Sequence, residues 1–181
     1  MTYLLNWREA VRQDRQELAV FTCTRAPVRS TIYPSKWEYE RPHEAKVQGW
    51  IRNDLKPPLV HPLHLLVGSD DLGIGAVSWL EEETETGDFF LKLMAIHCRL
   101  RDKGGGYADE MVEETLDFIT TAAISAGRDL VRVTGRVSEH NHNSQDMCRR
   151  AGLRHTGLVE GGRSLQVWSI DLIFADAPGI L

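Results

Sequence analysis

The sequence has little from which to build a disulfide framework, a membrane span or a secretory leader. It contains only three cysteines in 181 residues, far apart and without a C-x-x-C pair, which excludes a disulfide-rich scaffold. No apolar run approaches the ~20 residues that a membrane span needs. The first residues also lack a basic segment followed by an apolar one. We therefore expect a cytoplasmic protein with no membrane segment.

The composition and the charge exclude further classes of protein. With 15 glycines, 7 prolines and 42% hydrophobic residues, the chain fits neither collagen nor low-complexity disorder. Lys plus Arg is 21 and Asp plus Glu is 26, so the net charge is −5, which disfavours a broad nucleic-acid-binding face. The length suits one domain and no internal repeat is present. We predict a single domain over residues 1–181.

Hydrophobic spacing predicts a chain that mixes helices and strands. Strands are expected at 4–11, 63–67, 73–80, 89–96, 130–137 and 165–172, and helices from Asp14 and at 42–55, 107–123 and 143–151. The three strands between 63 and 96 should form an antiparallel meander. The segment 25–42 shows no clear period, so we predict a long loop there.

The most informative stretch is the apolar strand 89–96, which runs into a basic, glycine-rich turn at the start of an amphipathic helix. The three glycines 104–106 remove the Cβ atoms that would keep a ligand from the backbone, and a helix N-terminus attracts anions. Arg101 and Lys103 add positive charge, so the turn suits a pyrophosphate. Neither a G-x-x-x-x-G-K-[ST] loop nor a G-x-G-x-x-G βαβ frame is present, which argues against an NTPase or a Rossmann enzyme.

This turn resembles the acetyl-CoA motif of the GNAT N-acetyltransferases, [R/Q]-x-x-G-x-[G/A] after an apolar strand, and reads Arg101-Asp102-Lys103-Gly104-Gly105-Gly106. A second family pattern, N-x-x-[A/S]-x-x-x-Y-x-x-x-G-F, is matched downstream by Asn141, Ser144, Cys148, Gly152 and Leu153. The resemblance covers roughly residues 63–172. A helix and a strand separate the two motifs and a final β-hairpin follows, as in the family.

The resemblance implies an α/β fold whose mixed, largely antiparallel sheet is flanked by helices and splayed at the cofactor strand. It implies acetyl-CoA as co-substrate and direct transfer of the acetyl group to a primary amine of a small molecule or a peptide. The implied cofactor contacts are the backbone of Met94, Ala95 and Ile96 for the pantetheine arm, Arg101, Asp102, Lys103, Gly104, Gly105 and Gly106 for the pyrophosphate, and Asn141 and Ser144 near the reactive end. A homodimer is left open.

The chain departs from the family at both familiar proton-transfer positions. Cys148 stands where many members have a tyrosine that protonates the leaving thiolate; a thiol with a pKa near ~8.5 is a feasible acid, while packing is the alternative role. Arg136 stands where some relatives have a glutamate base. Glu82 and His97 lead as replacement bases. The wider set of candidates comprises Glu81, Glu83, Glu139, His140 and His142, and for each one a solvated surface position is the alternative.

Other features leave several roles open. The histidine pairs at 61/64 and 140/142 lack a third ligand at metal-site spacing, so we predict no metal site. Trp37 and the tyrosines of segment 25–42 are a hypothetical wall for the acceptor. The acidic stretch 81–88 favours a cationic acceptor, or simply solvates a hairpin tip. Two other functions remain: a CoA-binding sensor or interaction module, and a GNAT toxin acting on aminoacyl-tRNA. The negative net charge of the chain disfavours the toxin, because its substrate is a nucleic acid.

Overall fold

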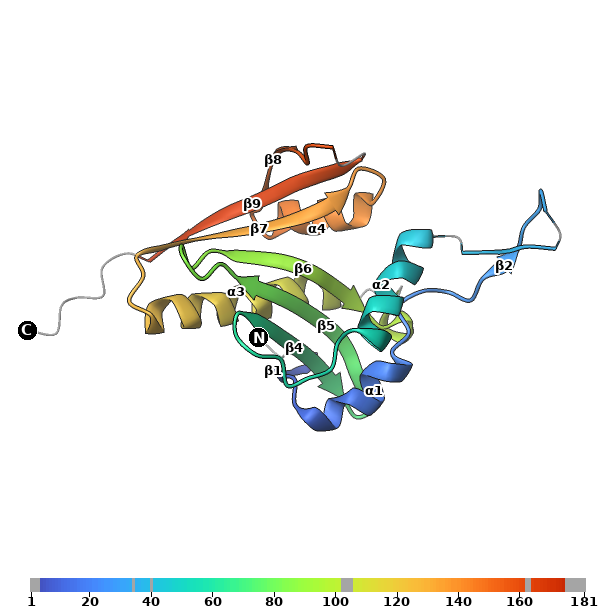
Figure 1. Ribbon diagram of the computed structural model, residues 1–181, viewed down its shortest axis with the longest axis horizontal. Helices are drawn as coiled ribbons and strands as arrows, with labels where there is room; N and C mark the ends of the chain where they lie inside the picture. Colours follow the sequence, from blue (N-terminus) through green and yellow to red (C-terminus); the bar gives the residue numbers. More distant parts are fainter. Residues whose placement is uncertain (1–3, 34, 40, 102–105, 162–163, 175–181) are drawn as a thin grey trace, which may run out of the picture.

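Seven strands form one sheet, and four α-helices pack around it (Figure 1). The computed structural model describes residues 4–33, 35–39, 41–101, 106–161 and 164–174. The elements in chain order are β1 (Asn6–Glu9), η1 (Arg12–Asp14), α1 (Arg15–Val20), β2 (Val28–Arg29), β3 (Trp37–Glu38), α2 (Pro42–Asn53), β4 (Leu63–Asp70), β5 (Gly73–Glu82), β6 (Phe89–Ile96), η2 (Cys98–Leu100), α3 (Tyr107–Ser125), β7 (Leu130–Ser138), α4 (His142–Arg150), β8 (Arg154–Leu158) and β9 (Leu165–Ile173).

The sheet has the strand order β1-β4-β5-β6-β7-β9-β8. All neighbouring strands run antiparallel except β6 and β7, which are parallel. The predicted meander β4–β5–β6 and the predicted mixed, largely antiparallel α/β fold are therefore confirmed. The parallel pair needs a crossover, and α3 supplies it between β6 and β7.

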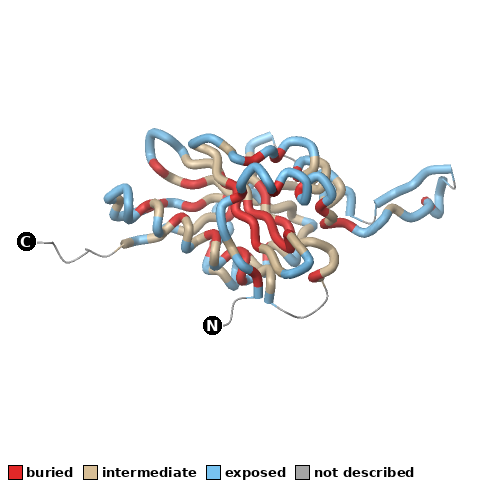
Figure 2. The backbone as a smooth tube through the Cα atoms, turned by 90° about the horizontal axis from the view of Figure 1, so that it is seen from below, coloured by how far each residue is buried: buried red, intermediate tan, exposed pale blue. Residues whose placement is uncertain are grey.

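Helices cover both faces of the sheet. α1 and α2 lie on one face, where Leu18 and Ile51 pack with Val67 and Val77 in a cluster of fully buried side chains. α3 lies on the opposite face, where Ile119 joins a second cluster of strand residues, and α4 lies on the same side as α3. Burying each such side chain stabilises the fold by about 1.5 to 3 kcal/mol. The buried residues are concentrated in the central strands (Figure 2).

The long helix α3 follows directly from its sequence pattern. Met111, Thr115, Ile119 and Ala123 recur at four-residue steps and are all buried, as expected for one face of a helix. The buried hydroxyl of Thr115 is satisfied, because it donates to the Met111 carbonyl at 2.6 Å and lies 2.9 Å from the Ser78 hydroxyl. α3 is thereby fixed against β5, which orients its N-terminus beside the end of β6.

The segment predicted as a long loop contains a small hairpin. β2 and β3 pair antiparallel, and Ser30 and Lys36 continue the pairing through a backbone hydrogen bond of 2.9 Å. We call this hairpin, residues 28–33 and 35–38, the arm. The arm projects from the body of the protein (Figure 1), and its residues are mostly exposed (Figure 2). Strands of two residues are too short to show a period, which is why the sequence indicated a loop.

Candidate functional site

The central feature of the site is the separation of β6 from β7. The two strands pair only from Phe89 to Leu91, opposite Val133 to Gly135, whereas β6 stays paired with β5 as far as Ile96. We call the paired stretch the joined end and the part beyond it, residues 92–96 of β6 and 136–138 of β7, the open end. The two strands diverge visibly at the open end (Figure 1). Backbone groups of β6 that face this gap have no strand partner on β7.

An irregularity in β6 marks the point of separation. Leu80 pairs with Leu91 and Trp79 pairs with Leu93, so Lys92 is an extra residue in the ladder between β5 and β6. Such a bulge bends the strand and disrupts the ladder locally, and bulges of this kind are frequent next to active sites. The bulge therefore coincides with the place where the β7 ladder ends.

The turn after β6 is built around His97. Its backbone N–H donates to the Gly75 carbonyl at 2.8 Å, and its Nδ1 accepts the Arg99 backbone N–H at 3.1 Å. The ring also meets Phe21 edge-on, with centroids 5.2 Å apart. Burial, followed by the charge of Arg99, lowers the pKa of His97. Because Nδ1 already accepts a hydrogen bond, the proton of the neutral ring lies on Nε2, and the geometry gives His97 the role of a cap for this turn.

Part of the predicted phosphate loop can be placed. The Arg101 guanidinium lies 2.8 Å from a carboxylate oxygen of Glu44 on α2, and Arg41 donates to the same oxygen at 3.1 Å. Asp102, Lys103, Gly104 and Gly105 lie outside the described residues. Gly106 caps α3 with a φ of 71°, and no atom of the described residues lies within 4 Å of where a Cβ would stand. The described residues therefore leave the approach to the helix N-terminus open at Gly106.

The second motif forms the start and the inner face of α4. The Asn141 side chain accepts the Ser144 backbone N–H at 3.3 Å and so caps the helix. Cys148 is 6% exposed and packs with Leu153 and Trp168. Burial raises the pKa of Cys148 to about 11. Donating a proton from such a thiol to a thiolate of ordinary basicity is uphill by about 3 kcal/mol, so its surroundings favour packing over acid catalysis.

Glu82 lies at the joined end, opposite Phe89. One carboxylate oxygen accepts from Arg128 at 2.8 Å, and the other lies 3.3 Å from His61 Nε2 and 3.6 Å from His64 Nε2. Burial by itself raises the pKa of Glu82, but the hydrogen bond and the charge of Arg128 outweigh it and the pKa is lowered. Glu82 is therefore an ionised partner of Arg128, on the side of the sheet covered by α3.

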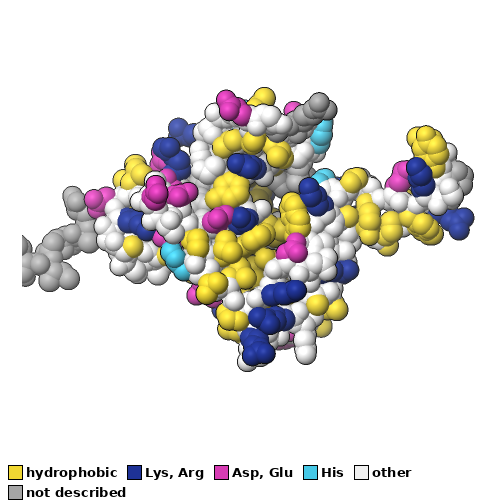
Figure 3. Space-filling model, viewed as in Figure 1, with side chains coloured by type: hydrophobic (Ala, Val, Ile, Leu, Met, Phe, Trp, Pro, Cys, Tyr) yellow, Lys and Arg dark blue, Asp and Glu magenta, His cyan; other side chains and the backbone are white. Residues whose placement is uncertain are grey.

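A different set of side chains surrounds the start of the open end on the α1/α2 side of the sheet. The Lys92 ammonium lies 4.9 Å from the ring centroid of Trp79 and 2.5 Å from a Glu81 oxygen, while the Arg136 guanidinium lies 5.1 Å from the ring centroid of Phe90. We call these five residues the open-face cluster. Hydrophobic side chains gather in the middle of this face, with basic and acidic groups among them (Figure 3). The cluster offers an apolar floor, two cations and one carboxylate.

The arm does not contribute to this face. Trp37 is 62% exposed and Tyr33 is 56% exposed. Within the arm, Arg29 lies over Trp37 at 5.5 Å and Lys36 lies over Tyr33 at 4.8 Å. Since the arm extends away from the body (Figure 1), its aromatic side chains do not line the open-face cluster in this structure.

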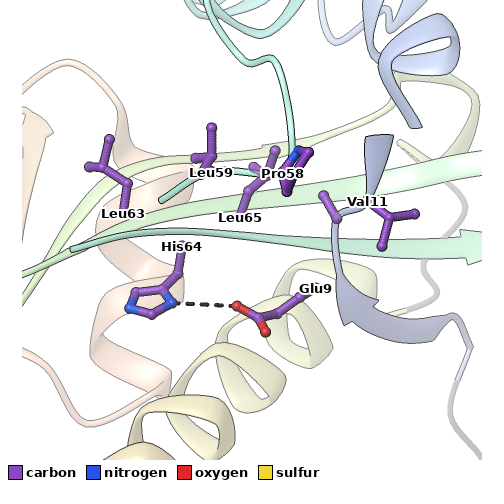
Figure 4. A pocket seen from close by; sticks show the side chains of 8 residues that line it. Glu9, Val11, Pro58, Leu59, Leu63, His64 and Leu65 are labelled. Carbon is purple, nitrogen blue, oxygen red and sulfur yellow. Dashed lines mark hydrogen bonds and ion pairs between the residues drawn. The ribbon is translucent and has the colours of Figure 1, made fainter. Parts of the chain in front are cut away.

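A pocket of about 250 Å³ lies elsewhere, at the outer edge of β4 (Figure 4). His64 points to one side of the strand toward Glu9, whose carboxylate lies 3.4 Å from His64 Nδ1, while apolar side chains line the other side. The lining residues are Glu9, Ala10, Val11, Pro58, Leu59, Leu63, His64 and Leu65. None of them belongs to the open end.

In the described ranges, no three His, Cys, Asp or Glu side chains are arranged to hold a metal ion, and no helix is long and apolar enough to cross a membrane.

Sequence reasoning named Glu81 and Arg136 but missed the rest of the open-face cluster. Trp79, Phe90 and Lys92 lie in strands whose apolar pattern is that of an ordinary core. The bulge at Lys92 leaves no sign in that pattern, because Leu91 and Leu93 are both apolar although they face opposite sides of the sheet. A lysine within an apolar strand was the one available signal.

Comparison with known proteins identifies the same family as the two motifs. A family profile described as "Acetyltransferase (GNAT) domain" matches residues 5–154. A search of curated proteins gives no significant match. Among solved structures, a protein described as an acetyltransferase of the GNAT family from Desulfovibrio desulfuricans superposes with a TM-score of 0.60 at 18% identity, over 94% of this chain and 99% of that one.

Two further structures show the same fold at low sequence identity. Nourseothricin acetyltransferase has a TM-score of 0.57 at 12% identity, over 96% of this chain and 100% of that one. The spermidine/spermine N-acetyltransferase of Vibrio cholerae has a TM-score of 0.56 at 16% identity, over 93% and 94%. The resemblance inferred from the sequence is thereby confirmed.

Proposed function

Because the chain belongs to the GNAT acetyltransferase family, we propose that it transfers the acetyl group of acetyl-CoA directly to a primary amine of a small molecule or a peptide. The observation that carries this proposal is the open end, where β6 keeps its β5 partner but has lost β7. A strand with one free edge can accept an extended ligand as an added strand. The pantetheine arm of CoA, which carries amide groups, is such a ligand.

The described residues fit this co-substrate. Met94, Ala95 and Ile96 lie in the part of β6 that is paired with β5 but not with β7, and they would offer backbone groups to the pantetheine arm. No described residue obstructs the N-terminus of α3 at Gly106, and a helix N-terminus stabilises phosphate groups. Arg101 would add its charge after exchanging Glu44 for phosphate. Asn141 and Ser144, at the start of α4, are proposed contacts near the reactive end, and Asp102, Lys103, Gly104 and Gly105 complete the proposed phosphate loop.

Acetyl-CoA supplies an acetyl group activated as a thioester. In the overall reaction a bond forms between the amine nitrogen and the acetyl carbon, the carbon–sulfur bond breaks, the amine loses a proton and the CoA sulfur gains one. A lysine-like ammonium has a pKa near ~10.4, so a base has to remove its proton before attack. Glu81 is the acid at the end of β5 that lies on the open-face side, beside Lys92. We propose Glu81 as the base, acting through water at its Oε1, because Lys92 binds its Oε2, whereas both carboxylate oxygens of Glu82 have partners.

The three residues selected from the sequence as proton carriers have other contacts. Glu82 is bound to Arg128, His97 caps the turn after β6, and Cys148 is buried with a raised pKa. These contacts favour structural roles for all three. The final protonation of the CoA sulfur can then come from water.

One observation favours a second candidate function, a CoA-binding sensor or interaction module without transfer. Both positions at which relatives carry a tyrosine acid or a glutamate base are altered here, to Cys148 and Arg136. Such a protein would keep the cofactor-binding backbone of β6 and the N-terminus of α3 while lacking turnover. The net charge of −5 continues to count against a toxin acting on aminoacyl-tRNA.

Thiol release separates these functions. The experiment incubates the protein with acetyl-CoA and a panel of amines, follows free CoA thiol, and identifies acetylated product by mass. We expect acetyl-CoA to bind in calorimetry and at least one amine class to release CoA. Binding without release from any amine would establish the sensor. Absence of binding would overturn the assignment of the open end to CoA.

A further inference from the structure

We propose that Arg136 binds a carboxylate of the acceptor, so that the acceptor is an amino acid or another amine that carries a carboxylate near its amino group. This inference rests on the proposed acetyl transfer and adds the chemical class of its acceptor. It begins from the position of Arg136, the first residue of β7 beyond the last pair with β6, Gly135 with Leu91. Arg136 therefore stands at the mouth of the open end.

The side chain of Arg136 lies on the face of the sheet that an acceptor would use. Its guanidinium lies 5.1 Å from the ring centroid of Phe90 on β6. Its neighbour directly across the antiparallel pair with β9 is Val167, which offers no charge. Phe90 in turn pairs with Glu81 of β5, so Arg136, Phe90 and Glu81 follow one another across three strands.

Unlike at least half of the sixteen arginines in the sequence, Arg136 has no acid beside it among the described residues. At least eight arginines bind a carboxylate, among them Arg132, which lies four residues earlier on the same strand and face and donates to Asp171 at 2.7 Å. Arg136 is exposed and, among the residues that the structure describes, has a contact with the Phe90 ring but no ion pair. A guanidinium stacked on an aromatic ring keeps its planar fork of donors free for a carboxylate.

The charge around the open end also favours an anionic group on the acceptor. From the sequence, the acidic stretch 81–88 indicated either a cationic acceptor or a solvated hairpin tip, but in the structure two of its five acids are paired with cations. Glu82 is bound to Arg128, and Glu81 is bound to Lys92. With Glu81 and Lys92 offsetting each other, the open-face cluster keeps the positive charge of Arg136.

These contacts define how such an acceptor would lie. Its carboxylate would meet the Arg136 fork, and its apolar part would rest on Phe90. The amino group would then extend toward β6 at Lys92, where the open end begins. Holding the acceptor by a charged group next to the amine orients the nucleophile as well as binding it, which increases the rate as well as the affinity.

The experiment compares α-amino acids with their own carboxamides and with the corresponding decarboxylated amines, at saturating acetyl-CoA. We expect the amino acids to show a kcat/KM about 10 to 100 times higher, the range of one charge-assisted pair. Arg136→Gln should remove that preference by lowering kcat/KM for the amino acids and leaving the carboxamides unchanged. Arg136→Lys should recover part of it. Acetyl-CoA affinity should stay at the wild-type value in both variants.

Arg132→Gln is the matched control, since it removes a guanidinium from the same strand and face that already has a carboxylate. It should keep the full preference for amino acids. Equal rates for amino acids and carboxamides, or a preference that survives Arg136→Gln, would overturn the inference while leaving acetyl transfer intact.

A binding measurement distinguishes this failure from failure of the proposed function. If no acceptor releases CoA, thermal shifts with CoA and the same pairs of ligands still report on Arg136. Stabilisation of the wild type by amino acids but not by carboxamides, lost in Arg136→Gln, would support the carboxylate site in a protein without transferase activity. Equal stabilisation by both members of each pair would reject it.

Discussion

The joined end and the open end of the β6–β7 pair use similar residues for different purposes. At the joined end, β6 and β7 pair from Phe89 to Leu91, and Glu82 is tied to Arg128. At the open end, the backbone of β6 has no partner on β7, and Arg136 has only an aromatic ring beneath it. The two ends therefore differ in pairing: the joined end has paired strands and a paired acid, and the open end, which lacks β7 partners for β6, is where the proposed function places the ligand.

At the joined end, the Arg128 side chain packs closely against the residues that it binds. Arg128 donates to both Glu82 and the Gly87 carbonyl, at 2.8 and 2.9 Å. Gly87 has a φ of 75°, and a Cβ there would lie 2.0 Å from the Arg128 guanidinium carbon. Glycine is therefore needed both for the backbone conformation and for the approach of Arg128. Around Gly106, at the N-terminus of α3, no atom of the described residues lies within 4 Å of where a Cβ would stand.

The largest expected effect tests the open end through Gly106. Gly106→Val forces a β-branched residue into a left-handed backbone conformation at the cap of α3 and places a side chain where phosphate groups would lie. We expect acetyl-CoA affinity to fall by about 100-fold or more in calorimetry, with a protein that remains folded by circular dichroism.

Gly127→Val provides the matched control at the other end of the same helix. Gly127 has a φ of 68° and equally open surroundings, so the backbone strain is the same, about 1 to 3 kcal/mol. It should lose stability to a similar extent and keep its affinity for acetyl-CoA. Equal affinities in the two variants would contradict the placement of the phosphates at α3.

A smaller effect is expected at the joined end, on stability. Glu82→Gln removes the ion pair with Arg128 and should lower the free energy of unfolding at pH 7 by about 1 to 2 kcal/mol, measured by urea denaturation. The pKa of Glu82 is lowered in the folded state, so its stabilising contribution is present above the unfolded-state pKa of about 4.3 and disappears as the pH falls through the folded-state value.

The wild type and Glu82→Gln should therefore converge in stability once the pH falls below the folded-state pKa of Glu82, which lies under the unfolded-state value of about 4.3. Acetyl-CoA affinity should be unaffected, since Glu82 lies at the joined end. A large loss of acetyl transfer with stability unchanged would instead identify Glu82 as a base and would remove the division between the two ends.

The smallest effect concerns Cys148. Because burial raises the pKa of this thiol to about 11, it is a poor proton donor, and we expect Cys148→Ala to keep kcat within about threefold of the wild type while stability falls by about 1 kcal/mol. Steady-state kinetics and thermal denaturation measure the two quantities. A kcat reduced by tenfold or more at unchanged stability would restore the thiol as the acid.

Regular elements with strong patterns were predictable from the sequence. The apolar spacing of α3 predicted residues 107–123, and the structure has Tyr107–Ser125. The five-residue strand β8 shows the opposite case. It lies at the sheet edge, where every residue except Gly157 is exposed, so no alternation of buried and exposed residues predicted it. The final β-hairpin, β8–β9 in the structure, was expected only from the family resemblance.

The parts of the candidate site formed by residues adjacent in sequence were predictable, whereas the parts formed by residues far apart in sequence were not. The glycine-rich turn and Asn141 were recognised because each belongs to a short motif of neighbouring residues. The pairing of Glu82 with Arg128 spans 46 positions and depends on how the end of α3 meets β5, which no local pattern encodes. The significance of Arg136 likewise needed the strand register, because a lone arginine in a strand gives no sign of lacking a carboxylate.

The backbone amide protons of the arm should exchange with solvent much faster than those of the central sheet. Its strands have two residues each, and an isolated two-stranded hairpin is marginal in water, so its amide protons should open to solvent at almost no free-energy cost. β5 lies between two long partners in the middle of the sheet, and its amide protons are released only when much of the protein unfolds. One chain thus combines protons that exchange almost at once with protons that persist for as long as the fold does.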